Sequence, residues 1–233
     1  MNEKNSVKIE YFDEIASTQD YVKEKRCFGE DLIAIAKRQT GGKGTKGRSF
    51  SSQLGGVYLT KLTFYENLPT KEGFKIMSGT AVAVCKTLES FGLKPVIKWP
   101  NDVFINGKKI CGILIENTFS GVKIVNSVVG IGLNVYNELP EELKDIATTM
   151  YQERGKIFSV EQVTRKLIAE LTQSNDMQEY QKRIGYLGEQ VSLLIGDKRI
   201  PATLLSVDEL GGLWVEIEDE KKRFASAEVS VRV

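Results

Sequence analysis

The sequence of 233 residues contains no histidine, only three cysteines and only five prolines. Without histidine, the chain cannot form a Ser-His or Cys-His nucleophile pair or a histidine-ligated metal site. Cys27, Cys85 and Cys111 are odd in number, widely spaced and set among apolar residues. This pattern predicts reduced thiols in the core, not disulfides or zinc ligands. Any catalysis must therefore use lysine, arginine, carboxylates and backbone amides.

Long apolar runs and an excess of either charge are also missing. No stretch approaches the roughly 20 apolar residues of a membrane-spanning helix. Residues 1–12 lack the basic end and the apolar run of a signal peptide. The 32 Lys and Arg nearly cancel the 31 Asp and Glu, so no overall field would hold DNA or an anionic membrane. We expect a cytoplasmic protein that binds neither DNA nor membrane, in which any anion site is local.

Hydrophobic periodicity divides the chain into two parts. Residues 17–25 and 74–91 have helical spacing, the second with Thr70 as N-cap and Gly92 as its stop. Short β-branched or alternating runs predict strands over 8–12, 32–37, 57–64, 96–98, 103–105, 110–116 and 122–130, with turns at Asn106-Gly107 and Ser120-Gly121. After Gly185 only short strands follow, over 190–195, 200–207, 213–217 and 223–225. The pattern predicts an α+β fold, with a mixed, largely antiparallel central sheet and flanking helices over 1–185 and a small β-barrel over 186–233.

The strongest chemical signal lies in the long aperiodic segment 39–56. Residues 41–48 hold four glycines and three cations. Glycines let backbone N–H groups converge on an anion, and the cations neutralise its charge. Gly42, Gly44 and Gly47 match the dinucleotide fingerprint, but no helix follows, and a P-loop lysine is missing as well. The segment predicts nucleotide or phosphate binding by another kind of loop, and a mobile solvated loop is the alternative.

Three further segments carry weaker signals. In 98–102, Pro100 fixes the backbone so that Asn101 and Asp102 are presented rigidly, although a tight turn with a buried tryptophan would look the same. In 108–116, lysines stand at the entrance of an apolar strand whose Gly112 lets another group approach closely. In 130–134, two glycines precede Asn134, which supplies a donor and an acceptor.

In order and spacing, five segments together resemble the biotin–protein ligase family: 14–19, 39–48, 98–102, 109–116 and 130–134. The resemblance covers about residues 8–233. It implies a class II synthetase-like catalytic domain followed by an SH3-like β-barrel. It also implies an enzyme that converts biotin and ATP, with Mg²⁺, into biotinyl-5′-AMP and pyrophosphate. The biotinyl group would then pass to a lysine of a biotin carboxyl carrier protein or domain, through a transient contact.

The resemblance also assigns roles to individual residues. Biotin would be bound by Ser17, Thr18, Gln19, Gln39, Gly41, Gly42, Lys43, Gly44, Thr45, Lys109 and Gly112. ATP would be bound by Lys43, Lys46, Arg48, Phe50, Trp99, Asn101 and Asn134, with Phe50 packed on the adenine. Lys109 would hold the biotin carboxylate and the acyl-phosphate, Asp102 would orient or deprotonate the incoming amine, and Arg48 would grip the phosphates. No residue is assigned to the metal.

Some features depart from the family pattern or leave alternatives open. Lys43 and Thr45 stand where the family often has arginine, which reduces bidentate grip on phosphate, and Phe50 stands where tryptophan is frequent. Because the first predicted strand begins almost at Met1, we expect no N-terminal DNA-binding domain. A homodimer through the edge of the central sheet is a hypothesis. The alternatives are a lipoate–protein ligase with the same adenylation chemistry and a non-catalytic phosphate- or nucleic-acid-binding module.

Overall fold

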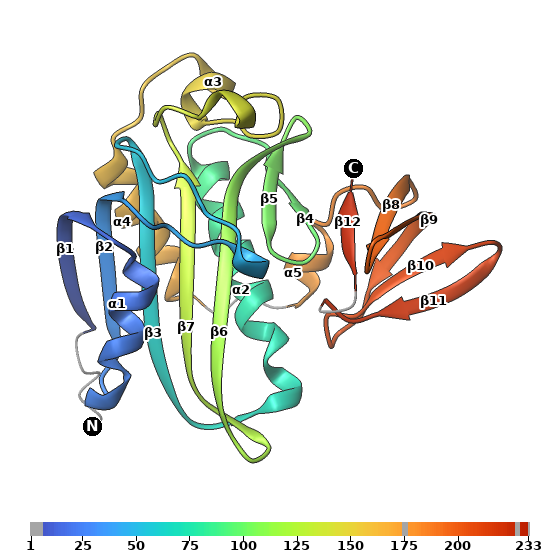
Figure 1. Cartoon of the computed structure of the whole chain (residues 1–233), viewed down its shortest axis with the longest axis horizontal. Coiled ribbons are helices and arrows are strands. Elements are labelled where there is room, and N and C mark those ends of the chain that lie inside the picture. The colour runs from blue at the N-terminus through green and yellow to red at the C-terminus, as the bar shows by residue number, and fades with distance from the viewer. Residues whose placement is uncertain (1–6, 174–176, 227–228, 233) are drawn as a thin grey trace.

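The computed structural model describes residues 7–173, 177–226 and 229–232, which form two sheets with helices around the larger one (Figure 1). The larger sheet has seven strands in the order β1-β2-β3-β7-β6-β5-β4: β1 Lys8–Ile15, β2 Leu32–Gln39, β3 Gly56–Pro69, β4 Val96–Lys98, β5 Asp102–Ile105, β6 Lys108–Ser120 and β7 Lys123–Asn134. The smaller sheet has five strands in the order β11-β10-β9-β8-β12: β8 Gln190–Ile195, β9 Lys198–Val207, β10 Leu213–Ile217, β11 Glu220–Phe224 and β12 Ser230–Arg232.

All neighbouring strands in both sheets run antiparallel except β1 and β2, which are parallel. The predicted fold class, a mixed and largely antiparallel sheet with flanking helices and a small C-terminal β unit, is therefore confirmed. The ends of the two predicted domains, residues 1–6 and 233, lie outside the described residues.

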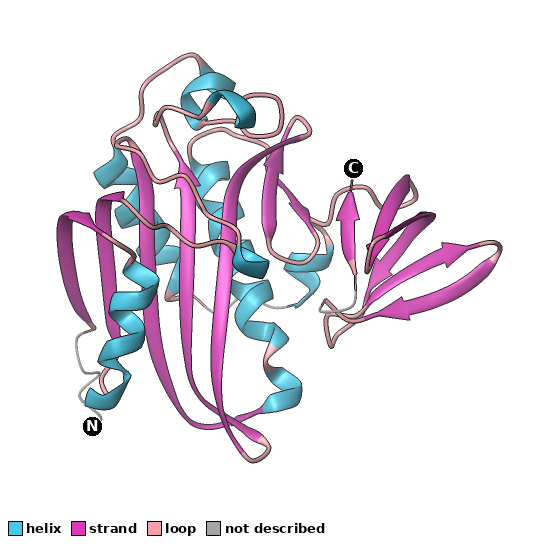
Figure 2. Ribbon diagram, in the orientation of Figure 1, coloured by secondary structure: helices cyan, strands magenta, loops and turns pink. Residues whose placement is uncertain are grey.

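The two faces of the seven-stranded sheet are covered differently. Buried Leu59 and Ile131 belong to the main core together with Leu88 of helix α2, Phe74–Ser90, and Figure 2 shows this long helix behind the sheet. On the opposite face, Val22 of helix α1, Thr18–Glu24, packs in a small separate cluster with Leu62. Because successive side chains of a strand point to opposite faces, Thr60 and its neighbours on adjacent strands face α1. The α1 face carries the smaller of the two hydrophobic clusters, which leaves part of this face to polar residues and glycines.

The described residues form five α-helices beside the larger sheet: α1 Thr18–Glu24, α2 Phe74–Ser90, α3 Met150–Arg154, α4 Val160–Leu171 and α5 Met177–Gln181. Gly92 follows α2 with a φ of 78°, as a helix stop requires. The predicted N-cap of this helix was wrong, because Gly73 occupies the cap position. Thr70 instead begins the 3₁₀ turn Thr70–Glu72 after β3, and its N–H donates to the carbonyl of Val122, which lies between β6 and β7. No helix in the described part of the chain has the length and apolar character that crossing a membrane requires.

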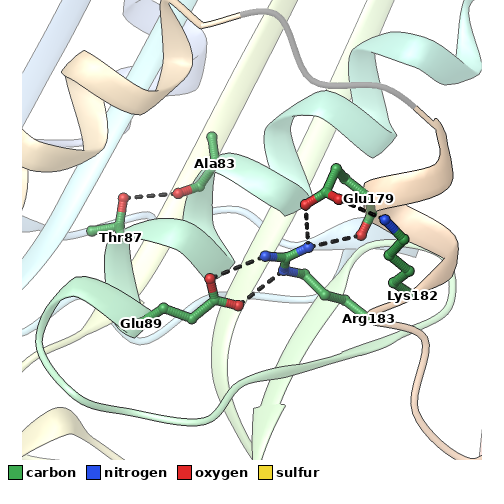
Figure 3. A network of polar contacts seen from close by, with 6 residues as sticks. All are labelled: Ala83, Thr87, Glu89, Glu179, Lys182 and Arg183. Atoms are coloured by element: carbon green, nitrogen blue, oxygen red, sulfur yellow. Dashed lines mark hydrogen bonds and ion pairs between the residues drawn. The ribbon is translucent and has the colours of Figure 1, made fainter.

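Arg183 fastens the segment that leads to the C-terminal sheet. Its guanidinium donates to both carboxylate oxygens of Glu89, at 2.9 and 3.1 Å, and to Glu179 Oε2 at 2.8 Å (Figure 3). The hydrogen bond to Glu89 is the main cause that raises the pKa of Arg183. On the backbone, Ile97 donates to the carbonyl of Arg183 and accepts from the N–H of Gly185. Helix α5, the end of α2 and strand β4 are thus tied at one point.

The three cysteines are reduced, but only two of them lie in the core. Cys85 and Cys111 are buried, and burial raises the pKa of Cys85 to about 12. Cys27 is exposed, which corrects the prediction that all three thiols are buried. It lies in the single 3₁₀ turn after α1, where its neighbour Phe28 is also 66% exposed. In a turn this short, an apolar residue next to Cys27 in the sequence does not indicate that the cysteine is buried.

Candidate active site

A cavity of about 470 Å³, partly open to solvent, lies on the α1 face of the seven-stranded sheet. Small residues of three adjacent strands form its floor: Thr60 of β3, Gly130 and Gly132 of β7 and Gly112 of β6. Thr60 pairs with Gly130, and Gly112 pairs with Gly132. Three glycines on one face leave the space that side chains would fill. We call this space the first cavity.

One end of the first cavity is a buried polar network. Gln39 Oε1 accepts from the N–H of Thr18 at 2.8 Å and from its hydroxyl at 2.9 Å. The hydroxyl of Thr60 donates to Thr18 Oγ1 at 2.8 Å, and Gln39 Nε2 donates to Ser52 Oγ at 2.9 Å. Since each partner fixes the next, this end is preorganised to exchange hydrogen bonds with a polar ring.

Lys109 marks the other end of the first cavity. It lies beside a register shift between β5 and β6, at Val103 and Phe104, which re-aims its side chain. Its Nζ is 2.7 Å from Asp102 Oδ1, and the two side chains are 31% and 21% exposed. A Cβ on Gly112 would lie 3.0 Å from the Lys109 ammonium. The missing side chain at Gly112 therefore provides the space in which the ammonium lies.

The distance between the polar network and Lys109 matches the length of a small extended carboxylic acid. From Thr60 to Gly112, the sheet is crossed by two strand-to-strand steps, β3 to β7 to β6, and by two residues along β6. At roughly 4.8 Å per step and 3.4 Å per residue, this distance is about 12 Å. A ligand with a hydrogen-bonding ring and a carboxylate on an alkyl chain fits such a channel.

Residues 39–52 cross the cavity as a narrow hairpin. The N–H of Phe50 donates to Gly42 O at 2.8 Å, and the N–H of Gly44 donates to Arg48 O at 2.7 Å. Lys43 Nζ lies 2.7 Å from Asp20 Oδ2 of α1, and the hydrogen bond with Asp20 raises the lysine pKa. The hairpin thus lies over the sheet in Figure 1 and is fastened to α1 by an ion pair.

Phe50 lies directly over the glycines of the floor. A Cβ on Gly132 would lie 2.4 Å from Cε1 of the Phe50 ring, and a Cβ on Gly112 would lie 3.3 Å from Cε2. Its ring also meets Tyr58 edge-on, with centroids 6.5 Å apart. Phe50 lines the first cavity, whereas the sequence analysis placed it on the adenine. The two paired glycines explain this position, because only they leave room for the ring.

A second cavity, of about 730 Å³ and partly open to solvent, adjoins the first. The two share Thr45, Asn101, Asp102, Ile113 and Leu114 in their linings. Three cations line the second cavity: Lys46, Arg48 and Lys98. Asp102 is the only carboxylate among the lining residues of both cavities in the part of the chain that the structure describes. This space suits a polyanion whose reacting end lies beside Asp102 and Lys109.

The C-terminal β unit contributes to the second cavity, through strand β12 and the segment before it. Ser226, Val229 and Val231 form part of its wall. Trp99, which lines the same cavity, donates from its indole N–H to Gly211 O at 3.0 Å. No motif marks the three C-terminal residues, because their role depends only on how the two sheets pack together.

The structure brings most of the predicted site residues together. The first cavity is lined by Thr18, Gln19, Gln39, Lys43, Gly44, Thr45, Phe50, Asn101, Asp102, Lys109 and Gly112. The second cavity is lined by Thr45, Lys46, Arg48, Trp99, Asn101 and Asp102. Four predicted residues line neither cavity: Ser17, Gly41, Gly42 and Asn134.

The four residues outside the linings have structural contacts of their own. Ser17 caps α1 by accepting from the N–H of Asp20 at 3.3 Å. Gly41 and Gly42 take part in the backbone hydrogen bonds of the hairpin. The buried Asn134 side chain donates to Thr148 O at 3.1 Å and accepts from the Asn137 amide. These contacts fix the backbone and the side chains next to the two cavities, and the binding roles predicted for these four residues stay predictions.

Two adjoining cavities that meet at one ammonium–carboxylate pair define a class of enzyme. A narrow channel that suits an acid opens beside a cationic space that suits a nucleotide. This arrangement is that of a ligase that activates a carboxylic acid with a nucleoside triphosphate.

Comparison with known proteins identifies the family. Residues 11–134 match the Biotin/lipoate A/B protein ligase family. The chain is 31% identical to the bifunctional ligase/repressor BirA of Bacillus subtilis over 239 aligned positions, covering 95% of this chain and 73% of that protein. A solved structure of the biotin protein ligase from Aquifex aeolicus, in complex with biotin and ATP, is similar with a TM-score of 0.76 and 31% identity, covering 97% of this chain and 98% of that one. The chain belongs to the biotin/lipoate protein ligase family.

Proposed function

We propose that this protein activates biotin with ATP to biotinyl-5′-AMP and transfers the biotinyl group to a lysine of a biotin carrier protein. The observation that carries the proposal is the position of Lys109 and Asp102, 2.7 Å apart, where the two cavities meet. The names of the relatives agree with it, since the Aquifex protein is a biotin protein ligase solved with biotin and ATP. A second relative, from Mycobacterium tuberculosis, is a biotin–[acetyl-CoA-carboxylase] ligase, 26% identical over 81% of this chain.

In the first step, a carboxylate oxygen of biotin attacks the α-phosphorus of ATP, and the bond to the β-phosphate breaks, releasing pyrophosphate. Lys109 lies at the end of the first cavity opposite the polar network, where it pairs with the acid and then with the acyl-phosphate oxygen. Lys46 and Arg48 line the second cavity and neutralise the phosphates. Charged donors in such a partly enclosed site stabilise negative charge as it develops.

In the second step, the acceptor amine attacks the acyl carbon, the bond to AMP breaks, and a proton leaves the nitrogen. Asp102 is the one carboxylate in the described lining of both cavities, so it is our candidate to orient the amine and accept the proton. No covalent enzyme intermediate is needed, which agrees with a chain that has no histidine. The hairpin 39–52 shields the mixed anhydride from water until the amine arrives.

Mg²⁺ is the metal that such a reaction uses, and the described residues of the site could bind it through one carboxylate together with the substrate phosphates. Among the described residues, no group of three His, Cys, Asp or Glu side chains could hold a metal ion. Mg²⁺ is commonly held by one or two carboxylates together with substrate phosphates and water. Asp102 is the residue that would contribute here, and the ion would supply charge neutralisation on the triphosphate.

The polar network in the first cavity favours biotin over lipoate. The ureido ring of biotin has two N–H donors and a carbonyl acceptor, whereas the dithiolane ring of lipoate has no comparable groups. A buried site built to exchange hydrogen bonds discriminates strongly against a ligand that lacks them, because its own groups then stay unpaired. Thr18, Gln39 and Thr60 are already paired with one another, but the buried Oε1 of Gln19 in the same cavity lining has no partner and would stay unpaired with lipoate.

The proposal is tested by mixing the protein with ATP-Mg²⁺ and either biotin, lipoate or no acid, with a biotin carrier domain as acceptor. Pyrophosphate release and acceptor mass are measured in parallel. We expect both signals with biotin only, and labelling at one lysine. Lipoate-dependent labelling would establish the alternative ligase. Nucleotide binding without release of pyrophosphate would establish a non-catalytic module.

A homodimer through the sheet edge is a further part of this proposal. Strand β1 is an edge strand of the seven-stranded sheet, and its Tyr11 is 71% exposed. An unpaired strand edge is a natural surface for pairing with a second copy. Sedimentation equilibrium would then give twice the mass of one chain, and a mass of one chain at the working concentration would end the dimer hypothesis.

A further inference from the structure

Gln19 lies at the polar end of the first cavity with one half of its amide unpaired. The residue is in the first turn of α1, is only 4% exposed and lines the cavity. Its Oε1 is buried and has no hydrogen-bond partner. A buried acceptor without a donor is unfavourable. Such an atom beside a ligand cavity therefore points to a donor that arrives with the ligand.

The orientation of the Gln19 amide is fixed by its surroundings. Gln19 Nε2 donates to Glu116 Oε2 at 2.7 Å and approaches Val128 O at 3.5 Å. An ionised carboxylate and a backbone carbonyl are both acceptors only, so the NH₂ group must face them. The amide oxygen is thereby turned the other way, over Gly130, where a Cβ would lie 2.5 Å from it. Gly130 is a floor residue of the first cavity.

Glu116 is held in its ionised form. Lys23 Nζ lies 2.8 Å from Glu116 Oε1, so the two carboxylate oxygens have one partner each. Partial burial opposes ionisation of Glu116, but the hydrogen bonds from Lys23 and Gln19 outweigh it and lower its pKa. A neutral amide or a protonated acid at this position could donate to Gln19, and the fixed orientation would be lost.

We propose that Glu116 is a positioning residue that turns the amide oxygen of Gln19 towards the first cavity, where this oxygen accepts one ring N–H of the bound acid. The inference rests on the proposed function. It adds that the site distinguishes the two ring nitrogens of the ureido group, since Gln19 offers one acceptor to one of them. Glu116 does not line the cavity itself and acts only through Gln19.

The probes are two biotin analogues, each methylated on one of the two ureido nitrogens, assayed in acid-dependent pyrophosphate exchange. In the wild-type protein, the analogue methylated on the nitrogen that faces Gln19 should have a KM at least roughly tenfold above that of biotin, because a hydrogen bond is replaced by a buried methyl group. In Gln19→Met and Glu116→Gln, biotin itself should bind roughly tenfold more weakly. In both variants, the ratio of the KM for that methylated analogue to the KM for biotin should fall towards one, and the KM for ATP should be unchanged.

Two control variants separate positioning from charge and from general damage. Lys23→Met removes the ion-pair partner of Glu116 but keeps the carboxylate, so discrimination between the analogues should persist. Glu14→Gln removes a carboxylate paired with Arg38 on an exposed part of the sheet, and it should behave as wild type. Melting curves of all variants check that each one folds.

Full discrimination in Gln19→Met or in Glu116→Gln, or none in the wild type, would overturn the inference. Failure of the proposed function is distinguishable, because the wild-type protein would then show no exchange with biotin at all.

Discussion

Replacing Lys109 by methionine keeps the aliphatic stem and removes the ammonium that lies 2.7 Å from Asp102. Because the lysine side chain is 31% exposed and the carboxylate also reaches solvent, the ion pair contributes only about 0–1 kcal/mol to folding. For a chain of this size, that loss shifts Tm by less than about 4 °C. Folding should therefore be nearly unaffected.

The expected effect on catalysis is much larger. An ammonium that pairs with charge developing on the acyl phosphate is worth about 3–4 kcal/mol in such a site, or roughly 10²–10³-fold in rate. The assay is biotin-dependent pyrophosphate exchange, with thermal unfolding measured on the same samples. We expect exchange to fall at least a hundredfold while Tm stays within a few degrees.

Lys108→Met is the matched control. The neighbouring lysine donates from Nζ to Lys144 O at 2.8 Å and lines neither cavity. It should keep wild-type exchange. If Lys109→Met retained activity within a few-fold of wild type, or if Lys108→Met lost as much, Lys109 would have no special place in the chemistry.

Three other predictions follow from single contacts. Gly132→Ala puts a methyl group 2.4 Å from the Phe50 ring, so the biotin KM should rise roughly tenfold. Gly79→Ala is the control, because its added methyl group would meet no atom within 4 Å apart from the backbone of its own helix. An unchanged KM in Gly132→Ala would show that the ring moves freely. Thr60→Val removes a buried hydrogen bond to Thr18, so urea unfolding should show a loss of about 1–2 kcal/mol; no loss would mean that the hydroxyl is dispensable. The hydrogen bond from Arg223 is the main cause that lowers the pKa of Asp208 to about 2. The difference in unfolding free energy between wild type and Asp208→Asn should therefore be largest above about pH 4 and shrink as the pH falls towards 2. A difference that does not depend on pH would contradict this origin.

Much of the local structure could be predicted, because strands and turns are encoded in short patterns. The predicted strands 190–195 and 213–217 coincide with β8 and β10. Asn106 and Gly107 have the positive φ values that a tight hairpin turn requires. Strand β12 was not predicted, because a strand of three residues leaves no periodic signal. Strand β12 pairs with β8, which lies far from it in the sequence, so no local pattern reveals the pairing.

Residues that motifs mark could be assigned to the candidate site from the sequence, whereas residues whose place depends on strand register could not. Lys109, Asp102 and Gln39 belong to marked segments, and the structure brings all three to one cavity. Thr60 lies in an ordinary alternating strand, and only its pairing with Gly130 shows that it faces the site. Phe50 was expected in the nucleotide site, but its position is decided by two glycines on different strands. Pairing between distant segments is not visible in one sequence.

We expect the two cavities to hold one acyl-adenylate between Lys109 and the polar network until an amine arrives. The most direct test is to incubate the protein with biotin and ATP-Mg²⁺, remove free ligands by gel filtration and measure the retained small molecule by native mass spectrometry. We predict one biotinyl-5′-AMP per chain, which disappears with release of AMP when a biotin carrier domain is added. Retention of unreacted biotin or ATP alone, or an adenylate that no acceptor discharges, would contradict the claim.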